Sequence, residues 1–339
     1  MGPRQLVALD LGSGSTRVVV LSRRKQHVHW DAAFNWPCLN EDMTFGPNRK
    51  TLAEMFAEAR IAAEYVSVIT SSGGTLIRLI NFPGRPPDGE MLLTQVRQAL
   101  GVDDSYMVHC QIVQELTKEK DGRDEFAAFS AALPAARVNQ VYDWVEGAGL
   151  KPVSMRASGT SMANLVRETK GLLKDGTGVG VLEIGHGSSM LFIFLGQDLV
   201  LARQFKLGSG VLVEHLRTSF ELDEATAAKF FVSGSFDFSA NIRPLIAPWL
   251  HQLAISLDFF ERRYGRSVES VAVFGGGAQS KVMETLIAGH IRRPLVRWNP
   301  MEALQDLPAP ASLTSNDWGI FASAAGEAAR VIRGGGRKA

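Results

Sequence analysis

Residues 179–203 read VGVLEIGHGSSMLFIFLGQDLVLAR, and this stretch indicates the fold. Three runs of β-branched and large apolar residues are separated by the turns GHGSS and GQD, a pattern that predicts a meander of three strands. Glu183 stands at the end of the first run, directly before the glycine turn. Because glycine lets backbone N–H groups approach a ligand closely, that turn is typical of an anion site, and of a phosphate site above all.

The start of the chain has the same arrangement. Residues 6–21 read LVALDLGSGSTRVVVL, in which Asp10 ends an apolar run, a Gly/Ser turn follows, and a second run begins at Arg17. A single Gly/Ser hairpin is commonplace and is weak evidence for phosphate binding. A matched pair is stronger evidence, and it predicts two similar half-molecules that face each other and offer their turns to one phosphate chain.

A third glycine cluster lies near the end of the chain. Residues 271–274 predict a strand, the turn GGGA follows at residues 275–278, and residues 280–287 predict a helix. Such a layout lets a base or a ribose lie flat against backbone. The alternative interpretation is a plain strand-to-helix connection, and the order of the three clusters favours the nucleotide site.

The bulk composition places the chain among globular proteins. Its 339 residues are 45% apolar and 21% charged, enough for two domains or one large two-lobed domain, and the net charge of +1 gives no global field for nucleic acid or an anionic membrane. Cys38 and Cys110 form no CxxC pair, which indicates a reducing compartment and no metal site. No apolar run reaches the roughly 18–20 residues of a membrane span, and residues 1–15 lack a signal-peptide pattern. We expect a cytoplasmic protein.

A Pro/Gly boundary, FPGRPPDG at residues 82–89, separates a small unit from what precedes it. The pattern after it predicts helix, strand, strand and helix, which is a small α+β unit. The expected division is a first lobe over residues 1–84, an inserted unit over 85–150, a return to the first lobe over 151–176, and a second lobe over 177–315. Residues 316–339 are expected to form a helix that returns to the first lobe, followed by a disordered tail.

The three glycine turns resemble the nucleotide loops of the actin-like ATPase superfamily. DLGSGSTR (residues 10–17) and EIGHGS (183–188) are similar to its two phosphate loops, and FGGGA (274–278) to its adenosine loop. Four weaker stretches resemble the PilM family of type IV pilus assembly proteins, relatives of FtsA: TLIRLINFP (75–83), VEGAGLKP (145–152), RQFKLGSG (203–210) and VRWNP (296–300). The resemblance implies an α/β, actin-like (ribonuclease H-like) two-lobed fold with an inserted α+β subdomain of the FtsA and PilM type.

The same resemblance implies a function. It indicates a cytoplasmic scaffold at the inner-membrane face that binds ATP and Mg²⁺ between its lobes and hydrolyses ATP slowly or not at all. Its inserted subdomain would grip the N-terminal cytoplasmic peptide of a PilN-like or GspL-like inner-membrane protein, without inserting into the membrane itself. A type IV pilus and a type II secretion-like system remain open, as does a homo-oligomer.

The resemblance also implies site residues, although no catalytic residue. Asp10 and Glu183 would hold the Mg²⁺ shell, largely through water. The nucleotide would contact Gly12, Ser13, Gly14, Ser15, Arg17, Gly185, His186, Gly187, Ser188, Lys229, Gly275, Gly276 and Gly277. For Asp10 an Asx motif that only anchors its own turn is the alternative. The His186 ring is predicted to lie in solvent.

Four positions depart from the family pattern. Glu183 stands where an Asp is usual, Thr226 where a Glu contacts the ribose, Arg156 where an acid is frequent, and Arg17 where a Lys is usual. The loss of acids weakens the case for turnover more than the case for binding.

Two other functions remain as alternatives. A sugar-kinase-type phosphotransferase would need a carboxylate as base near residues 153–161, where the sequence offers Ser154, Arg156 and Ser158. A polymerising protein of the FtsA or MreB type is also possible. The final residues RVIRGGGRKA have little apolar surface for an amphipathic membrane helix.

Overall fold

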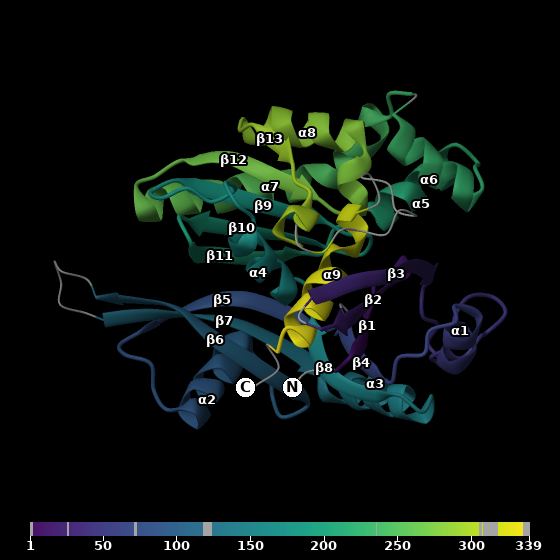
Figure 1. Ribbon diagram of the computed structural model, residues 1–339. Coiled ribbons are helices and arrows are strands. Elements are labelled where there is room, and N and C mark those ends of the chain that lie inside the picture. The colour runs from purple at the N-terminus through teal and green to yellow at the C-terminus, as the bar shows by residue number, and fades with distance from the viewer. Residues whose placement is uncertain are drawn as a thin grey trace.

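The protein has two lobes, each built on one β-sheet, in a computed structural model (Figure 1). The structure describes residues 3–25, 27–70, 73–117, 124–234, 236–304, 307 and 318–334. The pair Asp121-Gly122, which predicts a turn, and residues 335–339 of the expected tail lie outside these ranges. Within them, no helix is long and apolar enough to cross a membrane.

The first lobe has a five-stranded sheet with the order β3-β2-β1-β4-β8. Its strands are β1 (Gln5–Leu11), β2 (Ser15–Arg24), β3 (His27–Pro37), β4 (Tyr65–Thr70) and β8 (Lys151–Ala157). β2 pairs antiparallel with β1 and β3, whereas β1, β4 and β8 are parallel. The carboxyl ends of these three strands therefore lie on one side of the sheet, the carboxyl edge, which carries Asp10. Their amino ends lie on the opposite side, the amino edge.

The second sheet has eight strands with the order β13-β12-β9-β10-β11-β5-β7-β6. β9 (Gly178–Ile184), β10 (Ser189–Leu195) and β11 (Asp198–Phe205) form an antiparallel meander, which confirms the structure predicted for residues 179–203. β12 (Val268–Phe274) and β13 (Leu295–Arg297) extend it in parallel. β11 and β5 (Leu76–Pro83) meet only at the pair Arg203–Arg78 among the described residues, so the sheet is nearly divided there.

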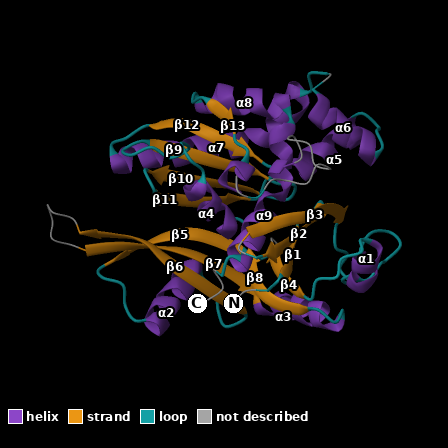
Figure 2. Ribbon diagram, in the orientation of Figure 1, coloured by secondary structure: helices purple, strands orange, loops and turns teal. Residues whose placement is uncertain are grey.

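Helices cover the sheet of the second lobe (Figure 2). They are α5 (Ser209–Ser219), α6 (Glu224–Ser233), α7 (Ser239–Tyr264) and α8 (Lys281–Ile291). The sequence predicts the longest amphipathic helix over residues 244–263, but α7 begins at Ser239 and contains both Pro244 and Pro248, so the predicted start is wrong. Proline inside a helix removes one backbone hydrogen bond and crowds the carbonyl of the preceding turn, and burial of Ile242, Ile246 and Leu250 against the sheet offsets this cost.

The segment between β4 and β8 divides between two cores. β5, β7 (Asp124–Pro134), β6 (Tyr106–Thr117) and α2 (Gly89–Leu100) share one apolar cluster. α3 (Ala135–Gly147) instead buries Val141 and Val145 against the first lobe, beside α1 (Leu52–Glu58). The unit predicted over residues 85–150 thus omits β5 and includes α3. We propose residues 76–134 as the inserted unit.

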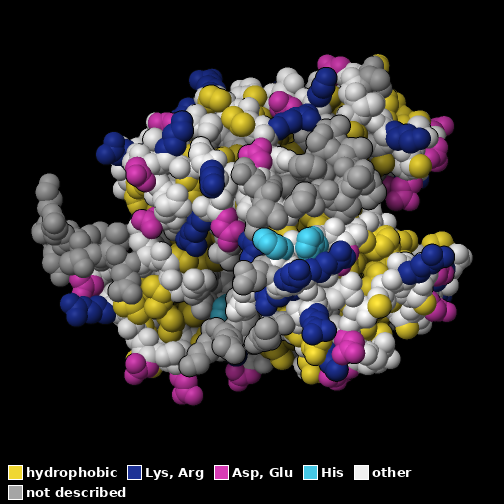
Figure 3. All heavy atoms as spheres, in the orientation of Figure 1, with side chains coloured by type: hydrophobic (Ala, Val, Ile, Leu, Met, Phe, Trp, Pro, Cys, Tyr) yellow, Lys and Arg dark blue, Asp and Glu magenta, His cyan; other side chains and the backbone are white. Residues whose placement is uncertain are grey.

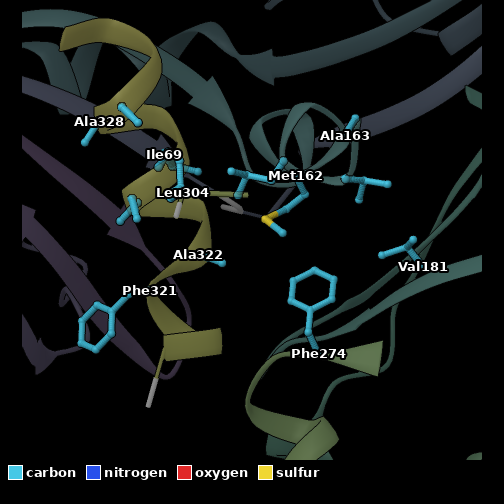
Figure 4. Close-up of a cluster of buried hydrophobic side chains, with 14 of the residues drawn as sticks. Ile69, Met162, Ala163, Val181, Phe274, Leu304, Phe321, Ala322 and Ala328 are labelled. Carbon is cyan, nitrogen blue, oxygen red and sulfur yellow. The ribbon is translucent and has the colours of Figure 1, made fainter. Parts of the chain in front are cut away.

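A continuous apolar core joins the lobes (Figure 4). α4 (Thr160–Glu168) and α9 (Trp318–Ile332) lie between the sheets and contribute Met162 and Phe321 to this core. Ile69 enters it from β4, and Val181 and Phe274 enter it from the second sheet. The sequence predicts a helix over residues 158–173, and α4 is shorter than this at both ends. Buried apolar surface therefore holds the two lobes together, in addition to the chain connections between them.

One buried carboxylate cross-links three elements of the first lobe to α9. Glu327 has no exposed surface, and it accepts hydrogen bonds from Ser67 of β4 (3.1 Å), Ser154 of β8 (2.7 Å) and Ser161 of α4 (3.5 Å). Arg330 donates two more bonds, at 2.8 and 2.6 Å, and Arg156 lies 3.5 Å away. Although burial raises the pKa of Glu327, the bonds from Arg330 hold it below its ordinary value.

We expect the substitution Glu327→Ala to lower the free energy of unfolding by about 3–5 kcal/mol, because it removes the carboxylate that two guanidinium groups share. Urea denaturation measures the change. Glu168→Ala, at an exposed site on the neighbouring helix, is the control and should stay within about 0.5 kcal/mol. Equal effects of both changes would contradict a structural role for the Glu327 network.

Candidate functional site

The first glycine turn joins β1 to β2. Gly12 N–H donates to the Asp10 carbonyl at 2.9 Å, and Asp10 is the cross-strand partner of Arg17. A Cβ at Gly12 would lie 2.4 Å from the Arg17 guanidinium and 2.8 Å from the Ser15 carbonyl oxygen. Only glycine fits there, because real Cβ atoms do not approach that closely. The turn thus brings the Arg17 cation against the backbone that follows Asp10.

The second glycine turn joins β9 to β10 and is tied to the start of α5. Gly185 N–H donates to the Ser188 carbonyl at 3.0 Å, which closes the turn. Ser209 N–H donates to the Gly185 carbonyl at 2.9 Å, and Gly210 N–H to the His186 carbonyl at 2.8 Å. The amino end of α5 therefore fixes the turn through two backbone hydrogen bonds.

The two turns touch each other. A Cβ at Gly14 would lie 2.6 Å from His186 Cγ, and one at Gly187 would lie 2.6 Å from Ser13 Oγ. On its other side the His186 ring faces Gly210, where a Cβ would lie 2.5 Å from Nε2. His186 is exposed, as predicted, although its ring also lies between two glycines, which the sequence did not indicate.

Two carboxyl groups approach each other between the lobes. Burial raises the pKa of Asp10 to about 6, although the Arg17 charge lowers it. Burial, and then the Asp10 charge, raises the pKa of Glu183 to about 7, again with Arg17 opposing. The structure thus brings Asp10, Arg17 and Glu183 together, as the sequence predicts. Partial burial, followed by Arg17, lowers the pKa of His186, which favours a neutral imidazole.

The space enclosed between the turns is small, although a hollow of about 920 Å³ opens beside them and is lined in part by Ser13, Gly187 and Ser188. A cavity of about 50 Å³ is lined by nine of the predicted site residues: Asp10, Gly12, Ser13, Arg17, Glu183, Gly185, His186, Gly187 and Ser188. Thr75, Ile77, Ser158 and Gln204 also line it, and the sequence analysis assigned none of them to the nucleotide site. Ser158 directly follows β8, and Thr75 directly precedes β5. Their position at strand ends is the signal that could have identified them.

The third glycine turn lies against the end of β9. Gly275 has φ +94°, and a Cβ there would lie 2.7 Å from the Ile184 carbonyl oxygen. A Cβ at Gly277 would lie 2.3 Å from Ile184 Cγ2, whereas one at Gly276 meets nothing within 4 Å. A separate cavity of about 160 Å³ lies beside Phe274, Gly275 and Trp298. The turn is therefore packed on one face and open at Gly276.

Some predicted residues lie outside these cavities. Gly14 and Ser15 belong to the first turn but do not line the small cavity. Lys229 is exposed on α6 and lines none of the cavities described here. Thr226, at the ribose position of the family pattern, donates to the capping residue Asp223 through its hydroxyl at 2.6 Å and its N–H at 2.9 Å.

A pair of carboxylates can hold Mg²⁺ through its water shell, since this ion keeps several waters. Asp10 and Glu183 fit that role, because a divalent cation would relieve the repulsion that contributes to the raised pKa of Glu183. Among the described residues, no group of three or more His, Cys, Asp or Glu side chains could form a direct metal site.

A further groove lies between the inserted unit and the first lobe. Its volume is about 740 Å³, and its walls come from β6, β8 and the end of α9. β6 pairs only with β7, so its other edge is unpaired within the described residues. Apolar side chains such as Met107 and Leu133 line the groove, together with Arg156 and Arg330.

Comparisons with known proteins identify relatives of this architecture. The family model of the type IV pilus assembly protein PilM matches residues 111–330. The solved PilM–PilN type IV pilus biogenesis complex is similar with a TM-score of 0.77 and 22% identity, over 96% of this chain and 98% of that chain. The ethanolamine utilization protein EutJ from Carboxydothermus hydrogenoformans gives 0.50 and 14%, over 98% and 91%. No curated protein sequence matches significantly. The predicted actin-like, two-lobed fold is confirmed.

We expect Gly14→Ala to cost about 1–3 kcal/mol of stability, because the new methyl group would overlap the His186 ring. His186→Ala in the same chain should restore most of the loss, and urea denaturation of both single variants and the double variant measures the coupling. Gly276→Ala, where a Cβ meets open space, is the control. If His186→Ala gives no rescue, the two turns do not touch in solution.

Proposed function

This chain belongs to the PilM family of type IV pilus assembly proteins, and from that membership and the geometry above we propose that it is an assembly scaffold. It holds a short segment of a PilN-like inner-membrane protein, and it binds ATP with Mg²⁺ between its lobes with slow or absent hydrolysis. The observation that supports this best is the groove of about 740 Å³ beside the edge of β6 that is unpaired within the described residues.

The groove suits an extended peptide. An unpaired strand edge can accept main-chain hydrogen bonds from an added strand, while pockets along it select alternate side chains. Met107 and Val153 face the groove from opposite walls with 45% and 41% of their surface exposed. The similar PilM structure was solved as a complex with PilN, which supports a partner segment of that kind here. A GspL-like partner would use the same chemistry.

The nucleotide site would require the turns to separate. The cavity enclosed by both turns has about 50 Å³, too little for a triphosphate, and the neighbouring hollow of about 920 Å³ touches the turns only at Ser13, Gly187 and Ser188. The His186 ring stands between the two turns. When they part, the backbone N–H groups of both turns and the Arg17 guanidinium would face the phosphates. Gly276 and its neighbours would then lie along the nucleoside, and Lys229 would reach it only from the edge of the cleft. Binding of ATP would therefore break the contact between the turns, and we expect its affinity to be low.

The residues around the cavity argue against rapid turnover. Asp10 and Glu183 are the only carboxylates among the described residues that line it, and both would be engaged with Mg²⁺. No third acid is placed to orient a water molecule or to act as a base toward a sugar hydroxyl. The sugar-kinase alternative therefore has no support from the site. No observation favours the polymerising alternative.

Replacing two groove residues should weaken partner binding. We expect Met107→Glu with Val153→Glu to reduce affinity for the N-terminal cytoplasmic segment of the organism's own PilN-like protein at least about tenfold, since both side chains supply exposed apolar contact. Fluorescence anisotropy of the labelled peptide measures this. The control is Ile255→Glu with Val296→Glu, two apolar residues of similar exposure outside the groove. Equal binding by both double variants would place the partner elsewhere.

Calorimetric titration with ATP and Mg²⁺ tests the second site. We expect weak, saturable binding that Asp10→Ala abolishes and that Asp88→Ala, at an exposed residue without a side-chain capping bond, preserves. Turnover should stay far below the roughly 1–100 s⁻¹ of kinases. Absence of binding by the unmodified protein would leave the cleft as a structural joint only.

A further inference from the structure

The amino edge of the five-stranded sheet is cationic. β1, β4 and β8 begin at this edge, and the β2–β3 hairpin turns there, since Arg24 is the cross-strand partner of His27. Five cationic residues lie there, and we call them the basic edge. The exposed ones are Arg4, Arg24, Lys25 and Lys151, and the half-buried one is Arg23. Arg4 and Arg23 are linked by a backbone hydrogen bond of 2.7 Å.

Two acidic residues lie at the same edge, and both are already paired. Asp31 lies 2.9 Å from Arg24 and accepts further bonds from Ser22 and Gln5. Glu64 lies 2.9 Å from Lys151. In the part of the chain that the structure describes, no carboxylate forms an ion pair with the other three cations, which are Arg4, Arg23 and Lys25.

This concentration of charge is local. The whole chain has 36 Lys and Arg against 35 Asp and Glu, so an average surface patch should be close to neutral. In Figure 3, Lys and Arg side chains (dark blue) and His side chains (cyan) lie next to one another over the first lobe. Exposed His27 and His29 of β3 continue the edge, without adding an acid.

The basic edge is continuous with the groove proposed for the partner segment. A hollow of about 630 Å³ at the amino edge is lined by Arg4, Gln5, Tyr65 and Val153. Val153 also lines the groove beside β6. A peptide seated in the groove therefore has one end of its path next to the basic edge, and the phosphate turns lie at the opposite edge of the sheet.

We propose that the basic edge rests on an anionic lipid surface while the groove holds the membrane partner. The choice of lipid rests on the proposed function, because a partner anchored in the membrane brings this edge near the headgroups. Unpaired Lys and Arg side chains near a membrane surface are attracted to anionic lipids. A weak contact of this kind adds to the partner interaction through effective concentration, without tight binding of its own.

Vesicle flotation with the full chain tests the proposal. The unmodified protein should bind vesicles of phosphatidylcholine and phosphatidylglycerol, and it should neither bind pure phosphatidylcholine vesicles nor remain bound in high salt. Arg23→Glu with Lys25→Glu should lower the bound fraction at least about tenfold. The matched control is Lys174→Glu with Arg266→Glu, which makes the same charge change at exposed sites before strands of the second lobe.

Binding that ignores lipid charge, or that falls equally in both double variants, would overturn the proposal. Binding of the partner peptide in solution, without vesicles, tests the scaffold function separately from the lipid contact. If Arg23→Glu with Lys25→Glu binds the partner peptide normally but loses the vesicles, the lipid contact is an independent property of the basic edge. If the unmodified protein binds no partner peptide, the scaffold proposal fails, while the vesicle result still decides the lipid contact.

Discussion

The contact between the two glycine turns is the constraint on which the arrangement of the lobes depends. Gly14 faces the His186 ring, and Gly187 faces Ser13, at separations that leave no room for another Cβ. Each turn ends a strand of a different sheet, so this contact fixes the distance between the sheets at their facing edges. α4 and α9 then fill the remaining space with apolar side chains, which makes the closed form a packed state rather than a loose hinge.

The electrostatics of the cleft follow from the same closeness. Asp10 and Glu183 come from different lobes, and closing the lobes takes both out of water, which raises both pKa values. Arg17 offsets part of that cost from the strand next to Asp10. Two carboxylates and one guanidinium leave one excess negative charge when all three are ionised, and the raised pKa values of the two acids reduce that charge.

The sequence predicted the parts of the fold that depend on local pattern. The meander of residues 179–203, the two matched turns and their acids could be read directly, because apolar runs and glycine positions determine them. The reach of His186 between Gly14 and Gly210 could not be read, since it depends on how two distant turns meet. The same holds for Glu327: a lone acid in an apolar helix gives no sign that Ser67, Ser154 and Ser161 converge on it.

Strand β8 links the two candidate sites. Val153 and Arg156 line the groove. Ser158, the first residue after the strand, lines the cavity between the two glycine turns. Glu327 holds the middle of this strand through Ser154 and Arg156, so the strand is anchored between the sites. A partner in the groove and a ligand in the cleft would therefore act on opposite ends of one rigid element. Because the two sites lie at different ends of one strand, the groove and the basic edge lie together, away from the two glycine turns.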